Sequence, residues 1–362
     1  MVVVGLLLMM GILMVYSASN AVSREASGDS YYFLKRQILW CFIGLLAMLA
    51  AASFDYRKYR SLAWPLMLLS FILLILVYVP SIGIEITGGR RWINLWGQSF
   101  QPVELAKLTL VICIAQLLSR SRDEITEFKS GILPSLLLLI AYIALIYEQP
   151  DFGSLVIMAS VTFIMLFVGG VKVKQMVLVM LVAGVLGAIA ILQKQYRINR
   201  LLIFLDPWKD PKDGGYHIIQ SFYALGCGGI LGTGLGAGMQ KLHYLPTPHT
   251  DFIFAVIGEE LGLVFSIFVV LLFMVIVWRG ISISLSTQNR FGSLLAFGIA
   301  SLIGIQAIIN IGVVTGSLPT KGLTLPFVSY GGTSILLTMI SVGILLNISK
   351  TRDRNLDFEK QW

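Results

Sequence analysis

The chain has 362 residues, of which 57% are hydrophobic and 13% are charged, and its mean hydropathy is +0.84. A soluble domain carries about 25% charged residues, so this composition excludes an ordinary soluble protein. The formal net charge is +8, but the sequence contains no soluble basic domain, and we expect no nucleic-acid partner. In a membrane protein, basic residues instead set the orientation and contact anionic membrane lipids.

Apolar runs of roughly 20 residues recur along nearly the whole chain, and each is long enough to cross the membrane as a helix. The sequence therefore predicts an all-α integral membrane protein in which residues 1–362 form a single polytopic membrane domain. About ten transmembrane helices are expected, near residues 2–18, 34–53, 61–80, 102–119, 131–147, 154–170, 175–194, 252–278, 292–315 and 331–349.

The loops between these helices alternate in length and charge. Short loops rich in Lys and Arg, such as 54–60 and 171–174, alternate with longer loops of lower basic density. The positive-inside rule then places both termini in the cytoplasm and the longer loops outside. One outer segment spans about 81–101. The largest outer loop, about 195–251, lies between helices 7 and 8 and contains the glycine cluster at 226–238.

The sharpest chemical signal is the segment HTDFIFAVIGEELG at 249–262. If a helix begins near Thr250, its small and acidic residues share one face, and Glu259 lies roughly 12 Å deeper than Asp251. Acidic groups inside a membrane are costly and mark functional sites by default. The alternative is structural: Asp251 caps the helix, and Glu259 pairs with a neighbouring helix.

Two further acidic positions precede this segment. Glu104 and Lys107, in QPVELAK at 101–107, are three residues apart and can pair on one helix face. This pair is either part of a polar cavity or a self-neutralising structural pair. Asp151, in EQPDFGS at 148–154, is expected to cap the following helix, with cavity lining as the alternative.

Basic residues in the predicted outer loops are candidates for binding phosphate. Arg91 lies beside Trp92, and Lys321 lies in a segment that also contains Ser329 and Tyr330. Arginine offers two parallel donors to phosphate oxygens, lysine offers a point charge, and the hydroxyl groups are further donors. For Arg91, the alternative is an anchor among lipid headgroups.

Several long motifs together resemble the SEDS family (shape, elongation, division and sporulation), which includes FtsW, RodA and SpoVE. The resemblance covers essentially the whole chain. The motif TKGLTLPFVSYGG is similar to the FtsW/SpoVE branch more than to RodA. The matching motifs are RRWI (90–93), SFQPVELAKL (99–108), EQPDFGS (148–154), FLDPWKDPKDGGYHIIQS (204–221), the glycine cluster, QKLHYLPTPHTDFIFAVIGEELG (240–262) and LPTKGLTLPFVSYGGTS (318–334).

The resemblance implies a fold, an activity and site residues. The fold is ten transmembrane helices with a large extracellular loop between the seventh and eighth, in the bacterial cytoplasmic membrane. The activity is peptidoglycan glycosyl transfer from lipid II. The family's essential aspartate corresponds to Asp251. Its RW, QPxELxK and TKG motifs correspond to Arg91, Trp92, Glu104, Lys107 and Lys321.

One position departs from the family pattern. His243 lies eight residues before Asp251, where division-type members often have an acidic residue. This departure puts any regulatory role of that position in doubt and leaves the catalytic interpretation unchanged.

The expected reaction is an inverting transfer at the outer leaflet with Asp251 as general base. We also assign His249, Glu259 and Ser329 to substrate binding. Positive charge for the leaving pyrophosphate comes from Arg91, Lys321 or a divalent cation, Mg²⁺ or Mn²⁺. The sequence names no metal ligand and requires no other cofactor.

Two other functions stay open at the level of sequence: a lipid II flippase or transporter, and a non-catalytic scaffold that recruits a transpeptidase. The resemblance also implies a partner, a class B penicillin-binding protein, which is a transpeptidase with a single membrane span. We expect that span to dock on the lipid-facing surface of the helices by close packing.

Overall fold

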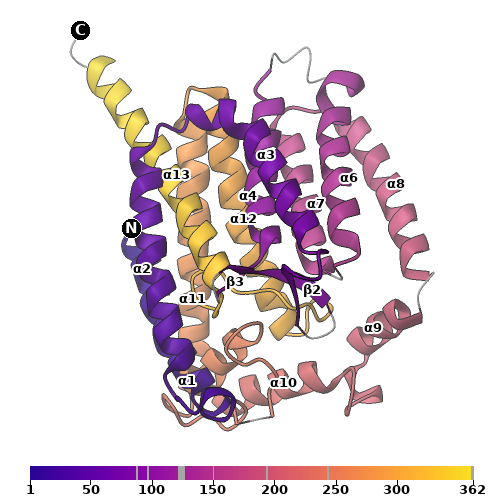
Figure 1. Ribbon diagram of the computed structural model, residues 1–362, viewed down its shortest axis with the longest axis vertical. Helices are drawn as coiled ribbons and strands as arrows, with labels where there is room; N and C mark the ends of the chain where they lie inside the picture. Colours follow the sequence, from indigo (N-terminus) through magenta and orange to yellow (C-terminus); the bar gives the residue numbers. More distant parts are fainter. Residues whose placement is uncertain are drawn as a thin grey trace. The chain divides into compact units, whose positions relative to one another are not determined.

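The computed structural model describes residues 1–86, 89–95, 98–120, 127–149, 151–192, 195–242 and 244–359. Every predicted helix coincides with a helix of the structure, which is therefore the helical membrane protein that the sequence predicts (Figure 1). These helices are α1 (Val2–Ser27), α2 (Tyr32–Ser53), α3 (Lys58–Leu76), α4 (Pro102–Leu117), α6 (Leu133–Tyr147), α7 (Phe152–Val168), α8 (Val173–Leu192), α11 (Ile253–Ser286), α12 (Arg290–Val314) and α13 (Gly332–Glu359).

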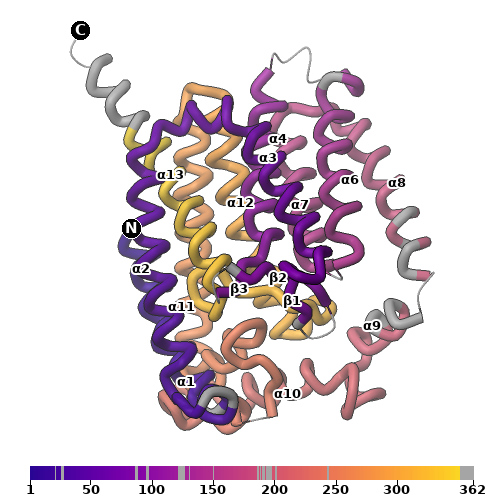
Figure 2. Tube along the Cα trace, viewed as in Figure 1, coloured from indigo at the N-terminus to yellow at the C-terminus, as the bar shows by residue number. Residues whose placement is uncertain are grey.

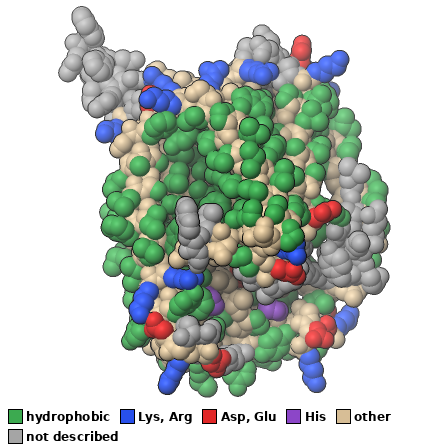
Figure 3. All heavy atoms as spheres, viewed as in Figure 1, with side chains coloured by type: hydrophobic (Ala, Val, Ile, Leu, Met, Phe, Trp, Pro, Cys, Tyr) green, Lys and Arg blue, Asp and Glu red, His purple; other side chains and the backbone are tan. Residues whose placement is uncertain are grey.

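The apolar composition of these helices fits a membrane. Among the described residues, six segments are long and apolar enough to cross it: Val2–Asn20, Tyr32–Ser53, Lys58–Leu76, Ile253–Ser286, Arg290–Val314 and Gly332–Lys350. Shorter apolar helices occur at Leu133–Tyr147, Phe152–Val168 and Val173–Val185. On the face drawn in Figure 3, hydrophobic side chains cover the helices along most of their length. The number of ten crossings stays a prediction.

The predicted outer loop contains regular structure. It holds α9 (Gln195–Leu205), the 3-10 helix η2 (Pro207–Lys209) and α10 (Tyr216–Gly228). The glycine cluster begins within α10, and from Gly229 to the start of α11 the described residues form turns, bends and irregular loop. His243, whose departure from the family pattern is noted above, lies outside the described residues.

The chain divides into two compact units. Unit 1 comprises Met1–Leu39, Val177–Val275 and Gln306–Gly331, and unit 2 comprises Trp40–Met176, Ile276–Ile305 and Gly332–Trp362. The helices α2, α8, α11 and α12 each begin in one unit and end in the other. The sequence predicts a single membrane domain over residues 1–362, and the division into two units leaves that prediction untested.

Helix α4 forms the centre of unit 2. It contacts α3, α6, α7 and α13, and the path of these helices can be followed in Figure 2. Pro102 occupies its first turn, where the missing N–H has no intrahelical partner to lose. All residues of α4 except Leu105 and Gln116 are buried, so its two charged side chains, Glu104 and Lys107, lie inside the unit.

A small antiparallel sheet, which the sequence analysis did not predict, precedes α4. It consists of β1 (Gly83–Ile86), β2 (Gly89–Leu95) and β3 (Gln98–Phe100) in that order. Alternation along a strand separates the two arginines of β2. Arg91 lies on the same face as buried Ile93, whereas Arg90 is exposed and pairs with Glu85 at 3.5 Å.

In unit 1, the glycine cluster packs against an interruption of α11. Gly262 has φ 77° and ψ −175°, so the helix is broken there. The amide groups of Thr233 and Gly234 donate to the carbonyls of Glu259 and Glu260 at 2.9 and 3.0 Å. A Cβ at Gly232 would lie 2.2 Å from the carbonyl oxygen of Glu260. The cluster is glycine-rich because the two backbones approach this closely.

Candidate functional site

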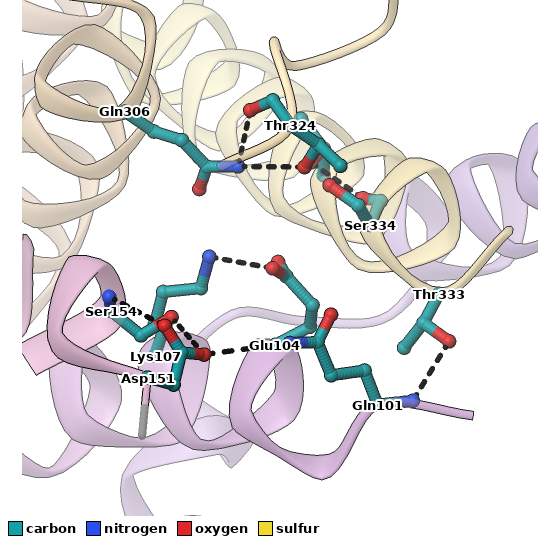
Figure 4. A network of polar contacts seen from close by, with 10 residues as sticks. Gln101, Glu104, Lys107, Asp151, Ser154, Gln306, Thr324, Thr333 and Ser334 are labelled. Carbon is teal, nitrogen blue, oxygen red and sulfur yellow. Dashed lines mark hydrogen bonds and ion pairs between the residues drawn. The ribbon is translucent and has the colours of Figure 1, made fainter. Parts of the chain in front are cut away.

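Several of the predicted site residues lie in two polar clusters, one in each unit, and Arg91, Trp92 and Glu259 lie outside them. The catalytic-loop cluster, in unit 1, consists of residues 247–251 before α11 and residues 320–330 before α13. The α4 cluster, in unit 2, consists of Gln101, Glu104, Lys107, Asp151 and Ser154 (Figure 4).

Asn310 of α12 joins the two loops of the catalytic-loop cluster. Its Nδ2 donates to the carbonyl oxygens of Asp251 at 2.9 Å and Leu323 at 2.6 Å. A polar side chain inside an apolar helix needs such partners, because an unsatisfied amide is costly in a membrane. Asn310 was not predicted as a site residue from the sequence. A polar residue within the apolar run of α12 was the feature that could have indicated it.

Ser329 fixes the same two loops. Its hydroxyl donates to the carbonyl of Thr250 at 2.5 Å and accepts from the amide of Leu325 at 2.8 Å. The side chain is buried, and the next amide, of Tyr330, donates to the carbonyl of His249 at 2.8 Å. The donor that we assigned to substrate is therefore already engaged, and Ser329 holds the loop that carries Asp251.

The carboxylate of Asp251 lies against the backbone of Gly322. A Cβ added at Gly322 would be 2.7 Å from its Oδ2. Lys321 is the adjacent residue, and the side chains of Asp251 and Lys321 are both half-buried. The two candidates for proton acceptance and phosphate binding are thus brought to one place, with part of each side chain open to solvent.

His249 lies in an aromatic setting next to this acid. Its ring centroid is 4.5 Å from that of Phe33 and 5.8 Å from that of Tyr330. Burial lowers the pKa of His249 to about 4. It is therefore neutral at pH 7 and supplies no positive charge to a phosphate, which narrows its predicted substrate role to packing or hydrogen bonding.

The loops also contain unusual backbone. Among the described residues, Thr247 and Phe327 are the non-glycine residues with positive φ, at 48° and 65°. Left-handed conformations at such residues cost free energy and cluster at active sites and ligand-binding loops. Both positions fall within the catalytic-loop cluster, which supports a functional role for it.

Glu259 takes a structural position. Its Oε1 accepts from the amides of Met239 at 2.6 Å and Gln240 at 3.0 Å, and the residue is 1% exposed. We predicted that it lines a substrate cavity with Asp251. Its carboxylate instead anchors the loop that follows the glycine cluster.

The neighbouring Glu260 was missed from the sequence, although it is the second acid of the same GEE triplet. It pairs with Lys241 at 2.5 Å and accepts from Ser17 of α1 at 2.7 Å. The two acids therefore point to different partners, and together they fix residues 236–241 to α11.

In the α4 cluster, the predicted pair of Glu104 and Lys107 is confirmed, with Nζ and Oε1 2.7 Å apart. Both side chains are at least nine-tenths buried. Asp151 caps α7, as expected, by accepting from the amide of Ser154 at 3.1 Å. Gln101, which the sequence analysis did not name, reaches Asp151 Oδ2 at 3.5 Å (Figure 4).

Arg91 approaches the turn between α6 and α7. Its Nε donates to the carbonyl of Gln149 at 2.8 Å, and Gln149 Nε2 donates to the carbonyl of Leu74 at 3.2 Å. Trp92 is half-buried on the opposite face of β2. Arg91 therefore links the sheet to two helix ends, a contact that neither of its predicted roles included.

The donor sets were also compared with the requirements of a bound metal ion. In the described part of the chain, no three His, Cys, Asp or Glu side chains are grouped closely enough to hold one. The described residues therefore offer no complete set of protein ligands for a metal. The divalent cation stays a prediction.

The sequence was compared with protein families. The FtsW/RodA/SpoVE model, described as a cell cycle protein, matches residues 1–354. The chain belongs to this family. The probable peptidoglycan glycosyltransferase FtsW of Geobacter sp. (strain M18) is 46% identical over 339 residues, which are 94% of this chain and 92% of that protein. Stage V sporulation protein E of Bacillus subtilis (strain 168) is 44% identical over 346 residues, or 95% and 94% of the two chains.

Solved structures support the same assignment. A chain from the work entitled "Structural coordination of polymerization and crosslinking by a peptidoglycan synthase complex" is 30% identical, with a TM-score of 0.77 over 94% of this chain and 96% of that chain. The rod shape determining protein RodA of Thermus thermophilus is 27% identical, with a TM-score of 0.70 over 97% and 95%. The predicted similarity to the FtsW/SpoVE branch is confirmed by the relatives named above.

Proposed function

We propose that this protein is a peptidoglycan glycosyltransferase that polymerises lipid II into glycan strands at the outer face of the cytoplasmic membrane, with Asp251 as general base. The observation that supports this proposal most directly is the position of Asp251, a half-buried residue whose carboxylate lies against Gly322, next to Lys321 in the chain. Family membership and relatives named as probable peptidoglycan glycosyltransferases support the activity.

The proposed step is an inverting displacement. The 4-hydroxyl oxygen of the acceptor lipid II attacks the anomeric carbon of the donor glycan while the bond from that carbon to the pyrophosphate breaks. Asp251 takes the hydroxyl proton, a contribution of about 10²- to 10⁴-fold in rate. The pyrophosphate leaves with the bonding electrons, and its charge is proposed to be stabilised by Lys321, by Arg91 or by a divalent cation.

Rigid loops favour this role for Asp251. Asn310, Ser329 and the amide of Tyr330 all bind the backbone of residues 249–251. A general base must be held close to the proton that it removes, and small displacements reduce the rate strongly. The loop contacts hold the backbone, while Asp251 as a residue stays partly exposed.

The break in α11 does not favour a transporter. Interrupted helices in transporters use their freed backbone groups to bind substrate or ions. Here the freed groups already have partners: the carbonyls of Glu259 and Glu260 accept from the glycine cluster, and the amide of Leu263 donates to the carbonyl of Gly229 at 3.0 Å. The interruption is a docking point for the protein's own loop.

A partner and an orientation complete the proposal. The structural relative in a peptidoglycan synthase complex supports assembly with a class B penicillin-binding protein, whose transpeptidase would cross-link the strands. Both termini are proposed to be cytoplasmic, because the short basic loops then face the cytoplasm.

The test compares Asp251→Asn with wild type in a purified lipid II polymerisation assay. Asparagine keeps the shape of the side chain and removes the proton acceptor, so glycan strands on a gel should fall by about 10²-fold or more. The matched control is Asp213→Asn, an exposed acid of the predicted outer loop, which should polymerise normally. Unaltered polymerisation by a folded Asp251→Asn variant would contradict the base role.

A further inference from the structure

A groove in unit 1 is separate from the residues assigned to the reaction. Its volume is about 700 Å³, within the range of about 300–1,000 Å³ that is usual for ligand sites. Five of its lining residues come from one stripe of α1, and Ala18 and Glu25 of the same helix lie beside that stripe. The end of the glycine cluster and the residues that follow it form the other wall. The α1 stripe consists of Leu13, Tyr16, Ser17, Asn20 and Arg24.

The stripe changes character along the helix. Spacings of three and four place its members on one face, and the distance from Leu13 to Arg24 along the axis is about 16 Å. Leu13 and Tyr16 lie within the apolar span Val2–Asn20, whereas Arg24 lies four residues beyond its end. The groove therefore begins at hydrocarbon level and ends at the level where lipid phosphates lie.

The opposite wall matches this gradient. Leu235 and Leu242 line the groove and are 63% and 42% exposed. Lys241 also lines it, but its charge is neutralised by Glu260. Arg24 is exposed, and none of the ion pairs among the described residues involves it. Arg24 is thus the cation at the rim that is available to an external anion.

We propose that this groove binds a phosphate-bearing membrane lipid, with its chain along Leu13, Leu235 and Leu242 and its phosphate on Arg24. The charge and the apolar wall are complementary to the two ends of such a lipid, and arginine is suited to bidentate binding of phosphate oxygens. The site does not depend on the proposed reaction, because no catalytic candidate lines it.

The lipid would also contact Lys241, which links α1 to α11. Lys241 in the groove wall donates to Ser17 of α1 at 2.8 Å and pairs with Glu260 of α11. The pair is already buried, with side chains 8% and 0% exposed, so it forms a fixed part of the wall against which the lipid would pack.

The experiment is native mass spectrometry of the full chain, delipidated in detergent and titrated with three lipids: phosphatidylglycerol, a polyprenyl phosphate and the phosphate-free diacylglycerol. Wild type should retain the two phosphate lipids and release diacylglycerol. Arg24→Gln should weaken their binding roughly tenfold, because it removes a charged hydrogen-bond donor. Binding of both phosphate lipids identifies the headgroup phosphate as the determinant, and binding of the polyprenyl phosphate alone identifies the carrier lipid as the ligand.

Two further variants make the result specific. Lys212→Gln removes an exposed cation of the predicted outer loop that does not line the groove, and it should bind lipid as wild type does. Leu242→Trp narrows the groove and should reduce binding of the phosphate lipids while a thermal melt shows a folded protein. Equal binding by Arg24→Gln and Lys212→Gln, or binding of diacylglycerol as tight as that of phosphatidylglycerol, would overturn the proposal.

Discussion

The acids of the two polar clusters are held in different ways. Asp251 lies on a loop and is half-buried, and Asn310 and Ser329 bind the backbone carbonyls of Asp251 and Thr250. Glu104 lies on a buried helix with its carboxylate bound to Lys107 of the same helix.

This difference separates catalysis from structure. A partly exposed acid on a loop whose backbone is held by hydrogen bonds is positioned to accept a proton from substrate. A buried carboxylate beside a lysine must keep its charge and its partner, since removing one of them leaves an isolated charge in a low-dielectric interior. The comparison predicts activity effects at Asp251 and stability effects at Glu104 and Lys107.

The largest stability effect is expected for Lys107→Met. The substitution leaves Glu104 buried without its cation, a loss of about 3–5 kcal/mol in the free energy of unfolding. The double variant Glu104→Gln with Lys107→Met should recover a large part of that loss, because both charges are then removed. Thermal melts of the single and double variants measure this. A double variant no more stable than the single variant would show that the pair is not the source of the stability.

His249 should make stability depend on pH. Its pKa is lowered from 6.5 to about 4 in the folded protein, so the unfolded chain binds the proton more tightly between these values. The folded state is then favoured fully above pH 6.5 and loses up to about 3 kcal/mol as the pH falls towards 4. Melting temperatures of wild type and His249→Phe should diverge in this window and run parallel above it. Parallel curves throughout would show that the ring is not buried in its neutral form.

Lys321 and Arg91 should respond differently to alanine. For Lys321→Ala, a lost charge-assisted contact of about 1.5–3 kcal/mol predicts a tenfold to hundredfold fall in polymerisation. Arg91→Ala should also lower the melting temperature, because Arg91 donates to the carbonyl of Gln149. Turnover and melts of both variants test this pair. Normal turnover in both would assign these cations to lipid headgroups.

The smallest effect is expected for Gly322→Ala, which tests where the Asp251 carboxylate lies. In Gly322→Ala the added Cβ would lie 2.7 Å from Oδ2, so the carboxylate must shift. Because Gly322 is exposed, stability should change little while activity falls about tenfold. Gly226→Ala is the control, since a Cβ there meets nothing within 4 Å. Equal activity of the two variants would remove Gly322 from the site.

Much of the fold could be predicted because each transmembrane helix satisfies its own backbone and shows its apolar length directly in the sequence. Boundaries shifted where polar flanks continued the helix, as at α11, which extends to Ser286 instead of residue 278. The sheet at Gly83–Phe100 was not predicted, because its strands are short and have no clear apolar alternation.

The site was predicted in part. The motifs pointed to Asp251 and Lys321, and the structure brings their loops together. Glu259 and Ser329 were assigned to substrate binding because both are polar residues close to Asp251 or Lys321 in the motifs. The sequence does not distinguish a polar side chain that faces a cavity from one that binds the backbone. Asn310 and Glu260 were missed because their hydrogen-bond partners are distant in the chain.

By itself the sequence determined the membrane class, the helix positions, the family resemblance, the local pair of Glu104 with Lys107, and Asp151 as the cap of the following helix. These depend on apolar length or on residues three apart, which are local properties. Only the tertiary structure decided that α11 breaks at Gly262 and that the glycine cluster satisfies the freed backbone. Such contacts join segments far apart in the chain, and they form only when both backbones are already in place.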